Sequence, residues 1–133
     1  MKTSTRALTA SVGVIVLTVI HHLYGAALYD APFRQHVAFG ILPVLLVLIL
    51  AHWVHRRRSL TSLGRVSLWV FMAVTLIVPV GMIGLFEGGY NHLVKNVLYI
   101  GGASRATLDQ LFPPPAYEMP NDLWFEVIGT LEV

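Results

Sequence analysis

Three long stretches without a charged residue constrain this chain more than any other feature. They run from Ala7 to Tyr29, from Gln35 to His55 and from Val66 to Phe86, and hold 23, 21 and 21 residues. A helix needs about 20 residues to cross about 30 Å of hydrocarbon. Charged residues make up only 12% of the chain, against about 25% in soluble domains. The sequence therefore predicts an all-α integral membrane protein with three transmembrane helices.

The first stretch also has features of a cleaved signal peptide. Lys2 and Arg6 precede it, and the small residues Gly25 to Ala27 lie near its end. Because the chain begins with Met1, we expect this segment to be retained as a transmembrane helix.

Basic residues are concentrated on one side of the predicted membrane. Lys2, Arg6, the arginines at 56 to 58 and Arg65 lie there with no acidic residue, whereas all seven acidic residues lie on the other side with three basic ones. The positive-inside rule predicts a multi-pass protein of the cell inner membrane with a cytoplasmic N-terminus and a periplasmic C-terminal segment. The net charge of +2 does not favour binding to nucleic acid. The expected partners are the lipid bilayer and either further copies of the chain or a larger membrane complex.

The apolar pattern of the third stretch continues beyond Glu87 to Ile100, which would give a helix of about 52 Å at 1.5 Å per residue. We therefore expect a bend or a broken hydrogen-bond ladder within a turn of Gly88-Gly89, followed by an outer amphipathic segment that ends at Gly101-Gly102. Small residues also line this helix and would pack against another span of the chain or against a second copy: Gly81, Gly84 and Gly88.

The character of the chain changes after residue 102. We divide it into a helical membrane domain, residues 1–102, and a periplasmic Pro-rich segment with a short terminal helix, residues 103–133. The prolines at 113 to 115 and at 120 predict extended chain over Ala103 to Pro120. Asn121 or Asp122 is a candidate N-cap for the terminal helix. That helix is either an interfacial anchor or the start of a fourth span, unless residues 129–133 belong to an engineered linker.

Histidine carries the main chemical signal. Ionisable groups at membrane depth are costly and usually mark a site. The depth of each residue follows from its distance in sequence to the end of its span. Five ionisable side chains are then predicted to lie in the outer half of the bundle: His21, His22, His36, Glu87 and His92. His52 and His55 lie beside the arginines at the opposite surface, where interfacial solvation accounts for them.

Imidazoles with a carboxylate, in a chain without cysteine, favour a transition metal such as copper, zinc or iron. Because His21 and His22 diverge by about 100° on a helix, we expect only one of them to face the interior. The step from Glu87 to His92 suits chelation only if the Gly88-Gly89 pair bends the helix. A b-type haem between His92 and one of the paired histidines ranks below a non-haem metal. Alternatively, Glu87 pairs with Lys95 or Arg34 and binds no metal.

The sequence has no phosphate-binding loop and no nucleophile elbow. Our first hypothesis is a small inner-membrane protein whose outer-leaflet His/Glu cluster binds a transition metal, for metal handling or in association with redox chemistry. The alternative is a non-catalytic accessory or oligomer-forming subunit that packs through its glycine strip and aromatic surface. A small proton-coupled carrier is a third hypothesis, and the sequence does not decide whether the protein is an enzyme.

Overall fold

The computed structural model describes residues 2–133, and within this range the secondary structure is helical. Three of its helical stretches, Lys2–Leu28, Pro32–Arg58 and Ser62–Ile100, are long and apolar enough to cross a membrane. The expectation of three candidate spans is thereby confirmed. The elements of these stretches are α1 (Lys2–Leu28), η1 (Pro32–Arg34), α2 (Gln35–Gly40), α3 (Leu42–Arg58), α4 (Ser62–Thr75), η2 (Leu76–Val94) and α5 (Lys95–Ile100).

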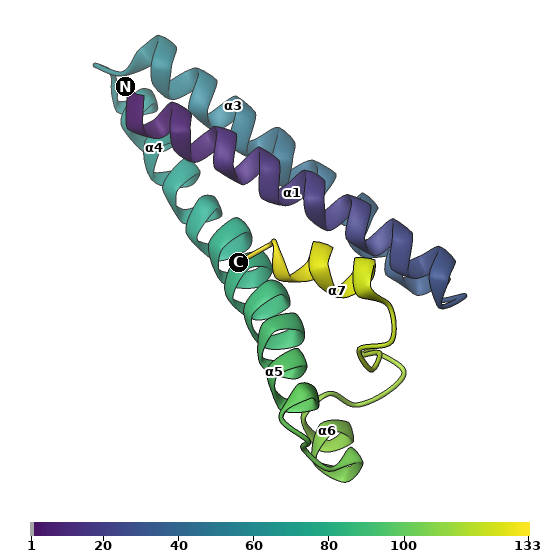
Figure 1. Ribbon diagram of the computed structural model, residues 1–133. Helices are drawn as coiled ribbons and strands as arrows, with labels where there is room; N and C mark the ends of the chain where they lie inside the picture. Colours follow the sequence, from purple (N-terminus) through teal and green to yellow (C-terminus); the bar gives the residue numbers. More distant parts are fainter. Residues whose placement is uncertain (1) are drawn as a thin grey trace.

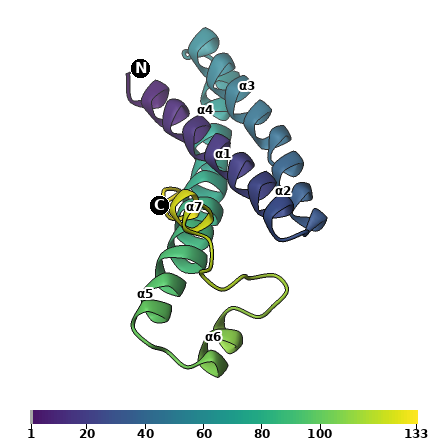
Figure 2. The same ribbon diagram turned by 45° about the vertical axis from the view of Figure 1, so that its right-hand side comes forward.

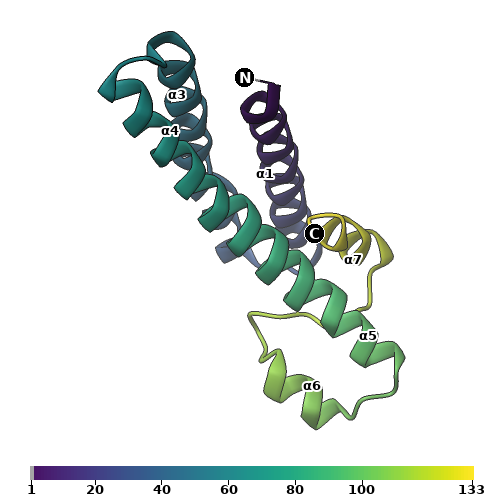
Figure 3. The ribbon, with the colours of Figure 1, turned by 90° about the vertical axis from the view of Figure 1, so that its left-hand side faces the viewer.

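The three stretches form an open bundle (Figure 1). Helices α3 and α4 make a hairpin (Figure 3), and α1 lies along α2 and α3. The long third helix diverges from α1 toward its α5 end (Figure 1). The terminal helix α7 (Leu123–Thr130) occupies the wedge that this divergence opens and contacts both α1 and η2 (Figures 1 and 2). The wedge is therefore the place where three segments distant in sequence, α1, η2 and α7, meet.

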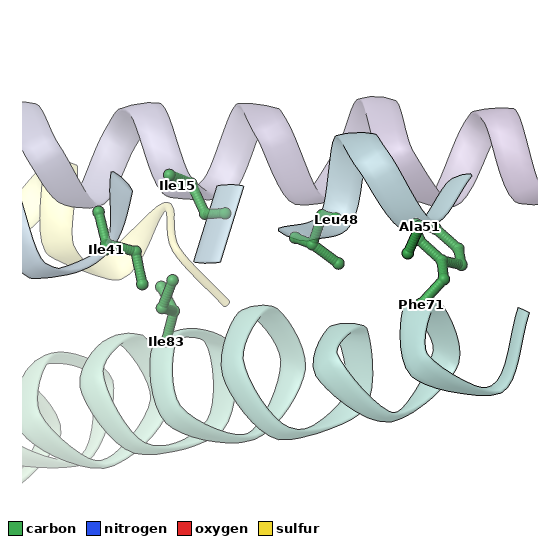
Figure 4. Packing of buried hydrophobic residues seen from close by; sticks show 6 residues of the cluster. All are labelled: Ile15, Ile41, Leu48, Ala51, Phe71 and Ile83. Carbon is green, nitrogen blue, oxygen red and sulfur yellow. The ribbon is translucent and has the colours of Figure 1, made fainter. Parts of the chain in front are cut away.

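A small apolar core holds α1, α3 with the residue before it, and the third helix together. Its buried side chains, shown in Figure 4, are Ile15, Ile41, Leu48, Ala51, Phe71 and Ile83. Many large apolar side chains outside this core are exposed, among them Trp69 and Leu85 at 70% and 67%. Such an outer surface is what a bundle solvated by hydrocarbon presents.

The prediction of a bend or a broken hydrogen-bond ladder at Gly88-Gly89 is wrong. The helix runs unbroken for 39 residues from Ser62 to Ile100. Its hydrogen-bond ladder changes to the wider π-helical pattern over Leu76–Val94, a segment that contains Pro79, and returns to α at Lys95. A Cβ on Gly81 would lie 3.1 Å from the carbonyl oxygen of Leu76, five residues earlier, so glycine fits this wide turn with little crowding.

The far end of this long helix packs against the segment that follows it. The Tyr90 hydroxyl donates to the carbonyl of Leu111 at 3.1 Å, and the Lys95 ammonium donates to the carbonyl of Glu118 at 2.8 Å. The helix ends as expected before Gly101-Gly102, where Gly102 adopts a φ of +81°.

The segment from Ala103 to Pro120 is not wholly extended, which corrects the expectation from its prolines. Helix α6 (Arg105–Leu111) forms because the Ser104 hydroxyl accepts a hydrogen bond from the backbone N–H of Thr107 at 3.1 Å. The prolines begin only after this helix. The N-cap of α7 is Asp122, one of the two candidates, and its carboxylate accepts from the N–H of Phe125 at 2.8 Å.

Part of the glycine strip is covered by the chain itself. A Cβ on Gly88 would lie 2.9 Å from the backbone nitrogen of Val133, and one on Gly84 would lie 3.4 Å from the carbonyl oxygen of Glu132. These two glycines therefore allow the residues after α7 to approach the long helix closely.

Candidate metal centre

Two histidines and a glutamate converge where α1, η2 and α7 meet. His21 comes from α1, and Glu87 and His92 come from η2. One ligand atom from each residue lies within 4.8 Å of the others, so the group could hold a metal ion. The side chain of His21 is fully buried and that of His92 nearly so, whereas 21% of the Glu87 side chain is exposed.

The distances within this group match the dimensions of a coordination site. The Nε2 atoms of His21 and His92 lie 3.1 Å apart, and the Glu87 Oε1 atom lies 3.9 Å from the first and 3.8 Å from the second. In the plane of these three atoms, one point is about 2.1 Å from each of them, which is the length of a zinc bond to nitrogen or oxygen. No movement of the side chains is needed to bring all three atoms to bonding distance of that point.

The π-helical ladder explains why Glu87 and His92 share a face. Both lie within η2, where a backbone N–H bonds the carbonyl five residues earlier. Residues five apart are then neighbours, as residues four apart are in an α-helix. The five-residue spacing therefore suits chelation without the bend expected at Gly88-Gly89. Glu87 is further fixed by Asn91, whose amide donates to its Oε2 atom at 2.8 Å.

Glu126 orients His92 from the other side. Its Oε2 atom lies 2.8 Å from the Nδ1 atom of His92. The pKa of Glu126 is held below its ordinary value, because the hydrogen bond from His92 and the positive charge of Lys95 outweigh the effect of burial, which alone would raise it. An ionised carboxylate can only accept, so His92 donates through Nδ1. A neutral His92 ring then has its lone pair on Nε2, the atom that faces His21 and Glu87.

Lys95 neutralises Glu126 within the same buried region. The ammonium lies 3.0 Å from the Oε1 atom of Glu126, and only 2% of the Lys95 residue is exposed. It also donates to the carbonyl of Glu118, so two of its three protons have acceptors. Lys95 does not pair with Glu87, which was one of the alternatives drawn from the sequence.

Phe125 packs over the histidines of the site. Its ring stacks on that of His21, with centroids 4.2 Å apart, and meets the ring of His92 edge-on at 5.3 Å. This contact needs a glycine at position 25, because a Cβ there would lie 2.5 Å from the Phe125 ring. Gly129 is required in the same way, since its Cβ would lie 2.4 Å from the ring of His92.

The structure places His22 and His36 beside the three-residue group but not in it. The Nδ1 atom of His22 is 3.0 Å from the carbonyl of Thr18, and that of His36 is hydrogen-bonded to the carbonyl of Phe33. Both residues line a cavity of about 160 Å³ that Glu87 and His92 also line. Of the five candidate ligands, His21, Glu87 and His92 come together. The expectation that only one of the paired histidines faces the interior is wrong, because both are buried, at 0% and 7% exposure, although only His21 joins the group.

His52 and His55 lie apart from this site. The ring of His52 packs against Phe71 at 5.5 Å between centroids, and the Nδ1 atom of His55 is 3.0 Å from the carbonyl of Gly64 in the α3–α4 hairpin. Neither contacts a carboxylate in the part of the chain that the structure describes. Their separation from the outer histidines is as expected from the sequence.

Sequence reasoning missed Glu126 as part of the site and assigned Lys95 a different partner. One signal was available: Glu126 is flanked by Phe125 and Val127 in an apolar terminal helix, and an acid in such a place needs a partner. Arg34 was the other suggested partner of Glu87, but its guanidinium instead lies 3.9 Å from the carboxylate of Glu118.

A second acid of the C-terminal segment, Glu132, is also buried. It is 0% exposed, and neither carboxylate oxygen has a hydrogen bond to the described residues. Burial and the nearby negative charge of Glu87 raise the pKa of Glu132 to about 8. Glu132 is therefore largely protonated at neutral pH, unlike Glu126.

Comparison with protein-family models, with curated proteins and with solved structures finds no match to this chain.

Proposed function

We propose that this protein binds one transition-metal ion through His21, Glu87 and His92 and serves metal handling or a redox partner. The observation that carries the proposal is the point about 2.1 Å from all three ligand atoms. Two imidazole nitrogens and one carboxylate oxygen suit zinc, copper or non-haem iron. The cavity beside Glu87 and His92 gives a water molecule or another small ligand access to the metal.

The same distances argue against a haem. Two axial histidines bind the iron from opposite faces of the porphyrin, which must fit between them. The Nε2 atoms of His21 and His92 are only 3.1 Å apart, and Glu87 lies against both of them. The proposal is therefore restricted to a non-haem metal.

Glu126 and Lys95 support the metal site from the next layer of contacts. A carboxylate that accepts from the second nitrogen of a ligating histidine fixes the ring and raises its basicity. Glu126 stands in this relation to His92, and Lys95 keeps Glu126 ionised and in place. We expect Glu126→Gln to weaken metal binding by about 10- to 100-fold, the usual effect of removing such a partner.

The test is a titration of the detergent-purified, metal-stripped protein with Co²⁺, followed by absorption spectroscopy and by metal analysis. We expect one ion per chain, and we expect Glu87→Ala and His92→Ala each to weaken binding by more than about 100-fold, because each removes one of three bonds. His52→Ala and His55→Ala are matched controls that should bind as wild type does. Equal binding by all variants, or none by wild type, would overturn the proposal and favour an accessory subunit in which the His21 and His92 nitrogens share a proton.

We further propose that the N-terminus is cytoplasmic and that the metal site faces the periplasm of an inner membrane. The supporting observation is the placement of six basic and no acidic residues on the N-terminal side of the membrane. A reporter fused after Arg58 should read cytoplasmic and one fused after Ser104 periplasmic. Readings from the same side for both fusions would contradict the three-span topology.

A further inference from the structure

The cavity beside the three-residue group is built from polar side chains of separate elements. It has a volume of about 160 Å³, and its lining includes His22 from α1, Arg34 from η1, His36 from α2, and Glu87 and His92 from η2. A water molecule needs only about 10–15 Å³ of such space, so several can enter. Glu87 is the one member of the three-residue group with substantial exposure, which places the approach to the site on this side.

Two histidines of this cavity have one ring nitrogen committed to the backbone. His22 donates through Nδ1 to the carbonyl of Thr18, and His36 donates through Nδ1 to the carbonyl of Phe33, since a carbonyl oxygen can only accept. In the neutral ring the lone pair is then on Nε2. Each of the two side chains therefore has a nitrogen that can bind a metal ion, and neither nitrogen belongs to the three-residue group.

The two residues differ in depth. His36 is exposed at the surface, whereas His22 is only 7% exposed and is the direct neighbour of His21 on α1. The rings of His22 and His21 are in edge contact, with centroids 5.2 Å apart. The order from solvent to the buried site is thus His36, then His22, then the three-residue group.

The charges around the cavity do not oppose the entry of a cation. Arg34 lies 3.9 Å from Glu118 and within 6 Å of three aromatic rings, and Lys95 is paired with Glu126. Each of these two cationic groups therefore has its own carboxylate, and the Glu87 carboxylate, which also lines the cavity, has no ion pair with a lysine or arginine within residues 2–133. A divalent ion therefore meets no uncompensated positive charge on this route.

We propose that this cavity is the entrance for the metal ion and that His36 and His22 are transient ligands that pass it to His21, Glu87 and His92. The inference rests on the proposed function. Successive imidazole nitrogens replace the water ligands of the ion one at a time, so the ion is never without ligands on its way to a buried site. A route of this kind speeds loading and release together and leaves the equilibrium affinity unchanged.

The test compares the rate of Co²⁺ loading by stopped-flow absorption with the equilibrium Kd. The His22→Ala/His36→Ala double variant should load and release Co²⁺ at least about tenfold more slowly than wild type, with a Kd within about twofold. The His52→Ala/His55→Ala variant removes the same number of histidines elsewhere and should load at the wild-type rate. Because His36 is exposed, the His36→Ala single variant tests the route without disturbing the buried wedge, and about a threefold slower loading is expected.

Two results would overturn the inference. Unchanged loading rates in both the single and the double variant would exclude the route, and a large rise in Kd would make His22 or His36 a ligand of the bound ion instead. Failure of the wild-type protein to bind Co²⁺ at all is a different result, because it refutes the proposed function itself.

Discussion

The two ends of the bundle both carry histidines, but only one end joins them to acids. At the site end, His21 and His92 meet Glu87 and Glu126. At the arginine end, which we define by Arg56, Arg57, Arg58 and Arg65, the histidines contact an aromatic ring and a backbone carbonyl. No acidic residue occurs between Asp30 and Glu87, so none is available from that part of the chain. A histidine in this protein becomes a candidate ligand only where a carboxylate is brought to it.

The basic residues at the two ends also differ in their burial and in their partners. Lys95 at the site end is buried and satisfied by protein groups, whereas Arg57 at the arginine end is exposed and lies 5.8 Å from the ring of Trp53. Buried ions depend on their partners, while exposed ones are solvated. The comparison predicts large effects of substitution at the site end and small ones at the arginine end.

The largest expected effect is that of Lys95→Met. The substitution leaves the buried Glu126 carboxylate without its cationic partner, which should lower the free energy of unfolding in detergent by about 3–5 kcal/mol. Arg57→Met is the matched control at the arginine end and should cost less than about 1 kcal/mol. Equal costs for the two variants, measured by chemical denaturation, would remove the distinction between the ends.

Gly129→Ala should have the next largest effect. Its new methyl group would lie 2.4 Å from the His92 ring and must displace that ring from Glu126 and His21, so we expect both weaker Co²⁺ binding and a loss of about 1–3 kcal/mol in stability. Gly13→Ala in α1 is the control. No atom lies within 4 Å of its added Cβ, so it should leave binding unchanged and stabilise the helix by up to about 1 kcal/mol. Normal metal binding by Gly129→Ala would contradict the packing described for α7.

Glu132 predicts a pH dependence that belongs to the site end alone. Its pKa is raised from 4.5 to about 8 by burial and by the charge of Glu87. The folded protein holds this proton more tightly than the unfolded chain, so the stabilisation is complete below pH 4.5 and is lost as the pH rises through 8. Glu132→Gln should remove the loss of stability that comes from this ionisation. The melting temperature of the variant should therefore fall less than that of wild type between pH 5 and pH 8, by an amount set by the pKa shift of Glu132. Identical profiles of melting temperature against pH for the variant and wild type would refute the role of Glu132 in this pH dependence.

The smallest expected effect is at the arginine end. His55→Phe removes the hydrogen bond to the carbonyl of Gly64 and should cost about 0.5–1.5 kcal/mol in unfolding free energy. The Kd for Co²⁺ should stay at the wild-type value, because His55 has no hydrogen bond or ion pair to a site residue within residues 2–133. A change in Kd would show that the two ends are coupled and would weaken the comparison.

The sequence by itself determined the number of candidate spans, the asymmetry of charge and the set from which the site is drawn. These are properties of single segments: the length of an apolar stretch, the side on which the arginines fall and the depth of a histidine along its helix. His21, Glu87 and His92 could be selected in this way without knowing any contact between helices. The N-cap at Asp122 and the helix end before Gly101-Gly102 are local in the same sense.

Only the tertiary structure decided which groups meet. His92 bonds Glu126 across 34 positions of sequence and His21 across 71. The first contact depends on α7 entering the wedge, and the second on the packing of η2 against α1. The π-helical register over Leu76–Val94 likewise sets Glu87 and His92 on one face, where an α-helical reading required a bend. The physical reason is that burial and pairing are collective: a carboxylate finds its histidine only after the helices that carry them have packed.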